Sequence, residues 1–149
     1  MIKRIFITAL GTLVSSSFLA QNIEDAMKFN ASGIMVYRTK MALSAENVAN
    51  GLTLYDEETG LPYQKKYAVL TTGKMGVKIQ GIERSTEPFG RYFDSTVPQS
   101  DENGFFYHPN VNLPNEMMNV KYAETLFEAN VNAYKISKSM YMNTLEILK

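Results

Sequence analysis

Residues 23–50 read IEDAMKFNASGIMVYRTKMALSAENVAN, and small or apolar side chains recur in this segment in steps of three and four. They form a seam in which Arg38 is the only charged member: Met27, Ala31, Ile34, Arg38, Met41, Ala45 and Val48. Such heptad spacing is typical of a helix that pairs with another helix along one side. Asn22 predicts the N-cap, and Asn50-Gly51 predicts a stop with glycine in the left-handed conformation.

A second helical pattern runs from about Pro114 to Leu148, with Asn112 or Leu113 as its cap. Its apolar residues form two adjacent stripes. The first contains Tyr122, Leu126, Ala129, Ala133, Ile136, Met140 and Ile147, and the second contains Phe127, Val131, Tyr134, Tyr141, Leu145 and Leu148. One partner helix cannot cover both stripes. We therefore expect neighbouring subunits to cover the remainder, the alternative being a helical hairpin with a wide core face.

The segment between the two helices predicts short strands and turns. The strand patterns are residues 67–71, 77–80, 91–93 and 105–107, with a turn at 73–76 and a bulge at Gly81-Ile82. The predicted fold class is mainly α, with two long terminal helices pairing as an antiparallel, coiled-coil-like hairpin around a small β region. The predicted divisions are 1–20 for an N-terminal extension, 21–50 for the first helix, 51–112 for the β region and 113–149 for the second helix.

The first twenty residues have the layout of a secretion signal. Lys3 and Arg4 precede an uncharged run from Ile5 to Ala20, which is shorter than a membrane span needs. Cleavage is expected after Ala20, with Ser17 as the second choice. An uncleaved apolar helix and a misassigned start site are the alternatives.

Composition excludes much enzyme chemistry. The 149 residues include 15 basic and 15 acidic side chains, one histidine and no cysteine. A zero net charge does not favour nucleic-acid binding, and thiolate chemistry is impossible. We interpret His108 as a loop histidine, Asp101-Glu102-Asn103 as a turn and Asp56-Glu57-Glu58 as a solvated charge run. We expect no catalytic, cofactor-binding or metal-binding residues and no small-molecule substrate; a small hydrolase would require carboxylates converging in a cleft.

Several stretches resemble the axial proteins of the bacterial flagellum, and specifically the FlgC family of proximal-rod proteins. The first helix resembles the N-terminal motif of rod and hook proteins, which ends in Asn-apolar-Ala-Asn, here Asn47 to Asn50. The β region and the C-terminal half carry the other matching stretches: 60–66, 76–78, 81–82, 101–105, 109–112, 116–118, 128–131, 138–140 and 144–147.

The resemblance implies a structural subunit and not an enzyme. In this family the terminal helices pack against neighbours into a helical tube that crosses the periplasm and transmits torque. The implied partners are further copies of the chain and FlgB-, FlgF- and FlgG-like rod proteins, with the membrane contacted only during export. The expected assembly residues are Met27, Ile34, Met41, Val48, Leu126, Ile136, Met140 and Leu145, while Asn47 and Asn50 end the first helix and direct the chain into the β region.

One departure concerns export. The family is normally exported by the flagellar type III apparatus without cleavage, whereas residues 1–20 resemble a general secretion signal. The expected location is the periplasmic basal body. The alternative is a rod-derived interaction protein, in the periplasm or at the cell surface, that belongs to a non-flagellar envelope assembly.

Overall fold

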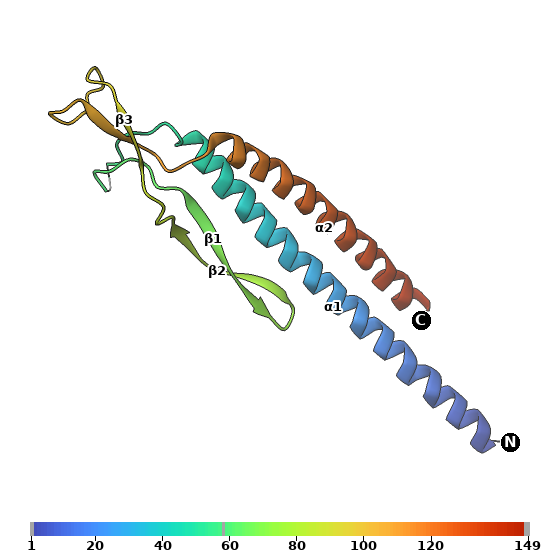
Figure 1. Ribbon diagram of the computed structural model, residues 1–149. Helices are drawn as coiled ribbons and strands as arrows, with labels where there is room; N and C mark the ends of the chain where they lie inside the picture. Colours follow the sequence, from blue (N-terminus) through green and yellow to red (C-terminus); the bar gives the residue numbers. More distant parts are fainter. Residues whose placement is uncertain (1, 58, 148–149) are drawn as a thin grey trace.

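The computed structural model describes the backbone of residues 2–57 and 59–147, and the side chains of residues 22–57 and 59–147. The order of elements is α1 (Ile2–Ala49), β1 (Lys66–Gly73), β2 (Gly76–Arg84), β3 (Gly90–Phe93), β4 (Phe105–His108) and α2 (Leu113–Ile147). Figure 1 shows an elongated molecule in which α1 and α2 run side by side, the β1–β2 hairpin lies along α1, and β3 and β4 lie beyond the helix pair. The predicted fold class is confirmed.

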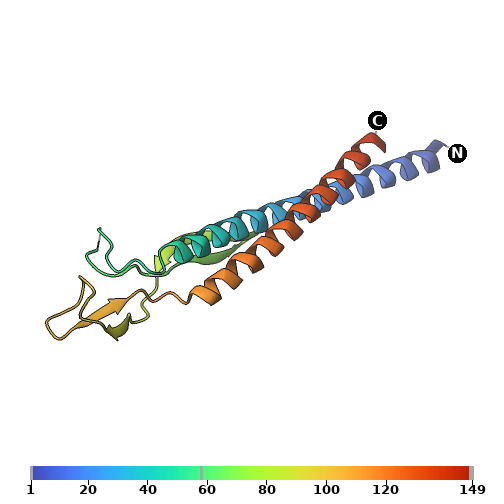
Figure 2. The same cartoon turned by 90° about the horizontal axis from the view of Figure 1, so that it is seen from above.

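The two helices are antiparallel and cross at a shallow angle (Figure 2). Asn47 near the end of α1 lies against Glu116 near the start of α2, and Gly33 lies against Asn130 further along. A Cβ atom at Gly33 would overlap the Asn130 side chain, which is held by a 2.7 Å bond to the Leu126 carbonyl. The close approach of the helices therefore explains a glycine that costs about 1 kcal/mol of helix propensity relative to alanine.

Two predicted features of the ends of α1 are wrong. Asn22 is not an N-cap, because α1 extends back to Ile2 through a segment that contains no proline. The helix does end at Ala49, but Gly51 does not adopt a positive φ. Space favours glycine there, since a Cβ atom would overlap the end of the Leu113 side chain and crowd the Asn47 carbonyl.

Of the two caps predicted for the second helix, Asn112 and Leu113, the structure confirms Asn112. The side-chain oxygen of Asn112 accepts a 3.0 Å hydrogen bond from the backbone N–H of Asn115. Asn112 is therefore the N-cap, and Leu113 is the first helical residue. Pro114 follows within the first turn, where the missing N–H costs nothing.

The β region consists of two separate two-stranded antiparallel sheets, β1–β2 and β3–β4. In the first, Val69 pairs with Gly81 and Leu70 pairs with Ile79, so Gln80 is the extra residue of a bulge. The bulge was predicted at Gly81-Ile82, one residue further along the strand. All four predicted strands are present, and each is longer than its sequence pattern by one to five residues.

Few apolar side chains are buried in the described part of the chain. Apart from the prolines Pro62 and Pro109, they are Val36, Leu43, Tyr63 and Ala123, and they are joined by the buried polar residues Ser44, Asn47, Ser85 and Glu116. Val36, Leu43 and Asn47 follow each other in steps of seven and four. The most buried side of α1 is therefore not the predicted seam, because α1 has two neighbours, α2 and the hairpin, and its burial is greatest between them.

Within the described residues, no helix is both long enough and apolar enough to cross a membrane. The side chains of the predicted secretion signal, residues 1–20, lie outside the described residues.

Candidate assembly site

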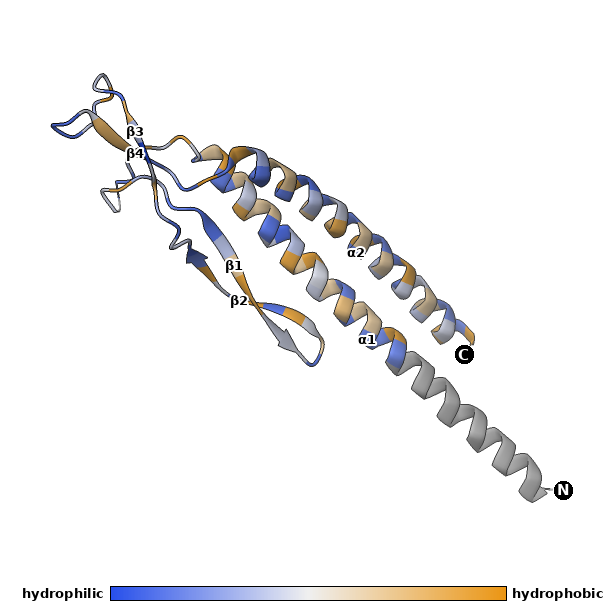
Figure 3. Ribbon diagram, viewed as in Figure 1, coloured by the Kyte–Doolittle hydropathy of each residue, from blue (hydrophilic) through white to orange (hydrophobic). Residues whose placement is uncertain are grey.

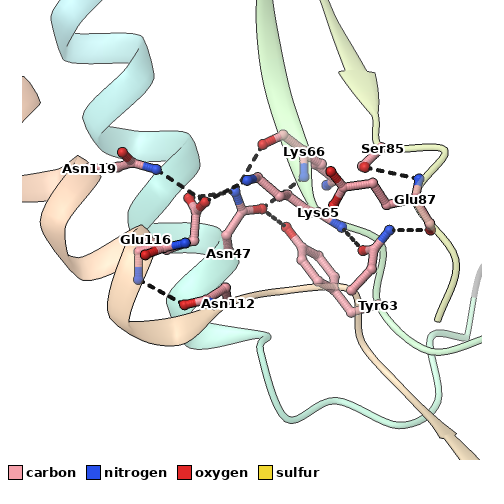
Figure 4. A network of polar contacts seen from close by, with 11 residues as sticks. Asn47, Tyr63, Lys65, Lys66, Ser85, Glu87, Asn112, Glu116 and Asn119 are labelled. Atoms are coloured by element: carbon pink, nitrogen blue, oxygen red, sulfur yellow. Dashed lines mark hydrogen bonds and ion pairs between the residues drawn. The ribbon is translucent and has the colours of Figure 1, made fainter. Parts of the chain in front are cut away.

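Asn47 is the centre of a buried cluster that joins three segments of the chain (Figure 4). Its side chain is 1% exposed and makes four hydrogen bonds. The Oδ1 atom accepts from the Lys66 N–H and from the Tyr63 hydroxyl, each at 2.9 Å. The Nδ2 group donates to the Lys66 carbonyl at 2.9 Å and to Glu116 Oε2 at 3.1 Å. Asn47 thus uses its full hydrogen-bonding capacity and pairs with the Lys66 backbone as a neighbouring strand would.

Glu116 is the second centre of this cluster, and its side chain is 1% exposed. Its Oε1 atom lies 2.9 Å from the Lys65 ammonium and accepts a 3.2 Å bond from Asn119. Its position near the start of α2 also places the negative charge where the helix dipole favours it. We call Asn47, Tyr63, Lys65, Lys66 and Glu116 the polar junction, since they tie α1, the start of β1 and α2 together.

Burial and hydrogen bonding act in opposite directions on Glu116. Burial alone would raise the pKa of its carboxyl group, but bonds from Lys65, Asn47 and Ser44 outweigh it and lower the pKa below the ordinary value of 4.5. Burial, assisted by the nearby carboxylate of Glu46, raises the pKa of the Tyr63 hydroxyl to about 12. The carboxylate is therefore the stable form of Glu116, and the neutral phenol is the stable form of Tyr63.

These shifts predict that the free energy of unfolding falls at both extremes of pH. Because the pKa of Glu116 is lowered by folding, its contribution is present above pH 4.5 and is lost as the pH falls through the folded-state value. Because the pKa of Tyr63 is raised by folding, stability is lost as the pH rises from 10.0 towards about 12. Urea unfolding across this range is the measurement. Glu116→Gln should flatten the acid limb, and an unchanged acid limb in that variant would contradict the assignment; the exposed-site control Glu124→Gln should leave it intact.

A second feature is an exposed apolar stripe along α2. It contains Met118, Tyr122, Ala129, Ile136, Met140 and Ile147, and we call it the outer stripe. Tyr122 is 66% exposed and Ile136 is 62% exposed. Orange apolar residues recur along α2 in Figure 3. In the other predicted stripe, Phe127, Val131, Tyr134 and Tyr141 are half-buried, whereas Leu145 is exposed. Leu126 and Ala133, which the sequence assigned to the first stripe, are half-buried as well.

The predicted assembly residues occupy three kinds of position. Ile136, Met140 and Leu145 are exposed on α2, whereas Met27, Ile34, Met41, Val48, Leu126 and Asn50 are half-buried. Asn47 is fully buried inside the subunit. Asn50 donates a 3.0 Å side-chain bond to the Glu46 carbonyl at the end of α1. The two asparagines thus lie at the end of α1 as expected, and Asn47 reaches the β region directly.

The residues examined for chemistry occupy turns and strand ends. His108 ends β4 and packs edge-on against Tyr92, with a ring separation of 5.7 Å. Asp101 accepts 2.9 Å bonds from the backbone of Asn103 and Phe105, as expected for a turn. Among the described residues, no group of three or more His, Asp or Glu side chains is placed to hold a metal ion.

Sequence reasoning missed four members of the polar junction, namely Tyr63, Lys65, Lys66 and Glu116. Glu116 resembles an ordinary acid in the first turns of a helix. Charged, small and amide residues occur close together in both helix sequences. Their presence does not indicate which segments of the chain come into contact.

The fold and the polar junction define a class of protein: an elongated helical hairpin that positions surfaces and has no reactive centre among its described residues. No protein-family profile matches the chain. Curated relatives do match. The flagellar basal-body rod protein FlgC of Buchnera aphidicola subsp. Acyrthosiphon pisum is 34% identical over 128 residues, which is 80% of this chain and 94% of the relative. FlgC of Agrobacterium fabrum is 28% identical over 135 residues, covering 85% and 96%. FlgC of Salmonella typhimurium is 28% identical over 124 residues, covering 78% and 90%.

The chain belongs to the FlgC family of flagellar basal-body rod proteins. It is accordingly a structural protein of the rod and not an enzyme.

Proposed function

We propose that this chain is a subunit of the proximal rod, and that α1 and α2 pack against neighbouring subunits to build a torque-transmitting tube in the periplasm. The observation that carries the proposal is the outer stripe. Ile136 and Met140 are 62% and 53% exposed in the isolated subunit, and Tyr122 and Met118 extend the same side of α2. Apolar surface of this extent on a long helix favours burial against another chain.

The arrangement of the subunit supports an open assembly. The outer stripe lies on α2 alone. If it packs against a different surface of the next copy, the contact between the two subunits is heterologous. Heterologous contacts that do not close produce helical filaments. The proposed neighbours are further copies of this chain and FlgB-, FlgF- and FlgG-like rod proteins, with contacts at Met27, Ile34, Met41, Val48, Leu126, Ile136, Met140 and Leu145.

Ile136→Asp tests the proposal in cells of the native host that lack the chromosomal copy. Because Ile136 is exposed, the folded monomer should lose less than about 0.5 kcal/mol of stability. A charge in a packed contact between subunits should instead abolish basal-body assembly and swimming. The measurements are swimming in soft agar, recovery of the protein with purified basal bodies, and urea unfolding of the monomer.

Met142→Asp is the matched control. Met142 is 50% exposed on the same helix but lies about 120° around the helix axis from Ile136. It should preserve assembly. Normal swimming with Ile136→Asp would reject the outer stripe as a contact, and equal loss in both variants would reject its specificity.

Export needs a separate measurement on the same basal-body preparation. We propose cleavage after Ala20, which would give a mature chain that begins at Gln21. Intact mass and N-terminal sequencing decide between this start and Met1. A processed protein that is absent from basal bodies would favour the second candidate function, an interaction protein of another envelope assembly, for which the signal-like segment of residues 1–20 is the supporting observation.

A further inference from the structure

An open cavity lies between β1 and the two helices, beside the polar junction. Its volume is about 320 Å³, which is in the range of small ligand-binding cavities. Tyr67 and Tyr122 in its lining are 42% and 66% exposed, so the cavity reaches the surface of the subunit. Three lysines also line it, namely Lys40, Lys65 and Lys66. The cavity therefore combines positive charge with tyrosine rings.

Lys40 supplies the positive charge that the subunit does not neutralise. The other two lysines are each paired with a carboxylate, Lys65 with Glu116 at 2.9 Å and Lys66 with Glu46 at 2.7 Å. Lys40 is exposed, and no carboxylate of the described residues forms an ion pair with it. A lysine of this kind at the edge of a cavity is suited to binding an acidic group from another chain.

The β3–β4 sheet carries the opposite charge. The chain between β2 and α2 contains four carboxylates and one basic side chain, Arg91. Arg91 lies 3.7 Å from Asp101, whose carboxylate also accepts 2.9 Å bonds from two backbone N–H groups of its turn. Glu102 in the same turn is exposed, and its side chain has no ion pair or hydrogen bond within the described part of the chain. Phe93 and Tyr107 on the adjoining strands are 67% and 51% exposed.

The cavity and the acidic turn are separated within one subunit. Lys40 lies nine residues, about 14 Å, before the end of α1 at Ala49, and the β3–β4 sheet lies beyond that end (Figure 1). In an assembly whose subunits all point the same way, a segment that projects past the helices of one subunit lies alongside a neighbour displaced along the axis. A contact between the turn of one copy and the cavity of another is heterologous and repeats without closing.

We propose that the acidic turn of one copy docks on the cavity of a neighbouring copy. Glu102 pairs with Lys40, and the exposed aromatic side chains of β3 and β4 pack beside Tyr67 and Tyr122. Charge complementarity selects this pair, since each partner carries a charge that its own subunit leaves unpaired and like charges placed opposite each other repel. The proposal rests on the proposed function, because it names one contact within the rod.

Zero-length cross-linking of native basal bodies tests the contact without any substitution. A carbodiimide activates a carboxylate, and an adjacent lysine amine displaces the activating group, so that an amide forms and the carbodiimide leaves as a urea. We expect mass spectrometry to identify an amide between Lys40 of one copy and Glu102 of another. Lys66 and Glu46, 2.7 Å apart, provide the internal positive control. Detection of the control amide alone, or of an amide between Lys40 and a different protein, would overturn the proposal.

Charge exchange tests the same pair in the native host. Lys40→Glu and Glu102→Lys should each reduce recovery of the chain with basal bodies at least about tenfold, because like charges then face each other. The double variant should restore at least about half of the normal recovery, together with swimming. Normal assembly of either single variant, or no restoration in the double variant, would reject the pair.

Lys78→Glu is the matched control for the charge change. Lys78 is also exposed, but it lies on β2 outside the cavity, so this variant should assemble normally. Equal loss in Lys78→Glu and Lys40→Glu would show that the effect is not specific to the cavity. Absence of the unaltered chain from basal bodies would instead reject the rod assignment, and with it the contact, so the two failures are distinguishable.

Discussion

Replacing Glu116 by alanine is expected to lower the free energy of unfolding by about 3–5 kcal/mol, the usual cost of removing one partner from a buried ion pair. The substitution leaves the Lys65 ammonium and the amides of Asn47 and Asn119 without their carboxylate acceptor. A typical domain is stable by only about 5–15 kcal/mol, so the variant should be largely unfolded at moderate urea concentrations. Circular dichroism during urea unfolding is the measurement.

Glu124→Ala is the control for this prediction. Glu124 lies on the same helix and pairs with Lys121 at 2.7 Å, but both side chains are exposed. Exposed pairs contribute about 0–1 kcal/mol. A similar loss of stability in the two variants would mean that burial of Glu116 does not determine its contribution.

Asn47→Ala should have the second-largest effect, on the order of 3 kcal/mol, because each buried polar group that loses its partner costs about 1–3 kcal/mol. The groups concerned are the backbone N–H and carbonyl of Lys66, the Tyr63 hydroxyl and one Glu116 oxygen. We expect the hairpin base to loosen as well as the helix pair. Urea unfolding gives the first effect, and exchange of the Lys66 amide reports the second.

Asn50→Ala provides the comparison within the same motif. The Asn50 side chain donates one hydrogen bond of 3.0 Å, to the Glu46 carbonyl, and is half-buried, so its loss should cost about 1 kcal/mol or less. The Asn47 and Glu116 substitutions share a hydrogen bond, so their effects should not add. Additive effects in the double variant would show that the two residues act separately.

The sequence predicted those parts of the fold that depend on local patterns. The strands, the N-cap at Asn112 and the presence of two stripes on the second helix follow from residue spacing alone. The buried side of α1 did not follow from its sequence pattern, because α1 packs against both α2 and the β1–β2 hairpin. Asn22 is a residue type that favours the N-cap position, but this preference has no effect in the interior of a continuous helix.

The candidate site was harder to predict because its members lie far apart in the chain. Asn47 and Glu116 are 69 positions apart, and nothing local to either residue indicates the contact. Gly51 illustrates a second difficulty. The pattern explained this glycine by backbone conformation, whereas the structure explains it by the proximity of Leu113.

The contact between Asn47 and Glu116 also reduces the conformational entropy of the chain. It closes a loop of 69 positions, and the chain entropy lost on such closure corresponds to about 4 kcal/mol by the logarithmic law for flexible loops. Among the described residues, the few buried apolar side chains offer limited compensation for that loss. The hydrogen bonds and ion pair of the polar junction, which lie where the loop closes, offset part of this entropy loss. The rest of both helices therefore stays available for contacts with other chains.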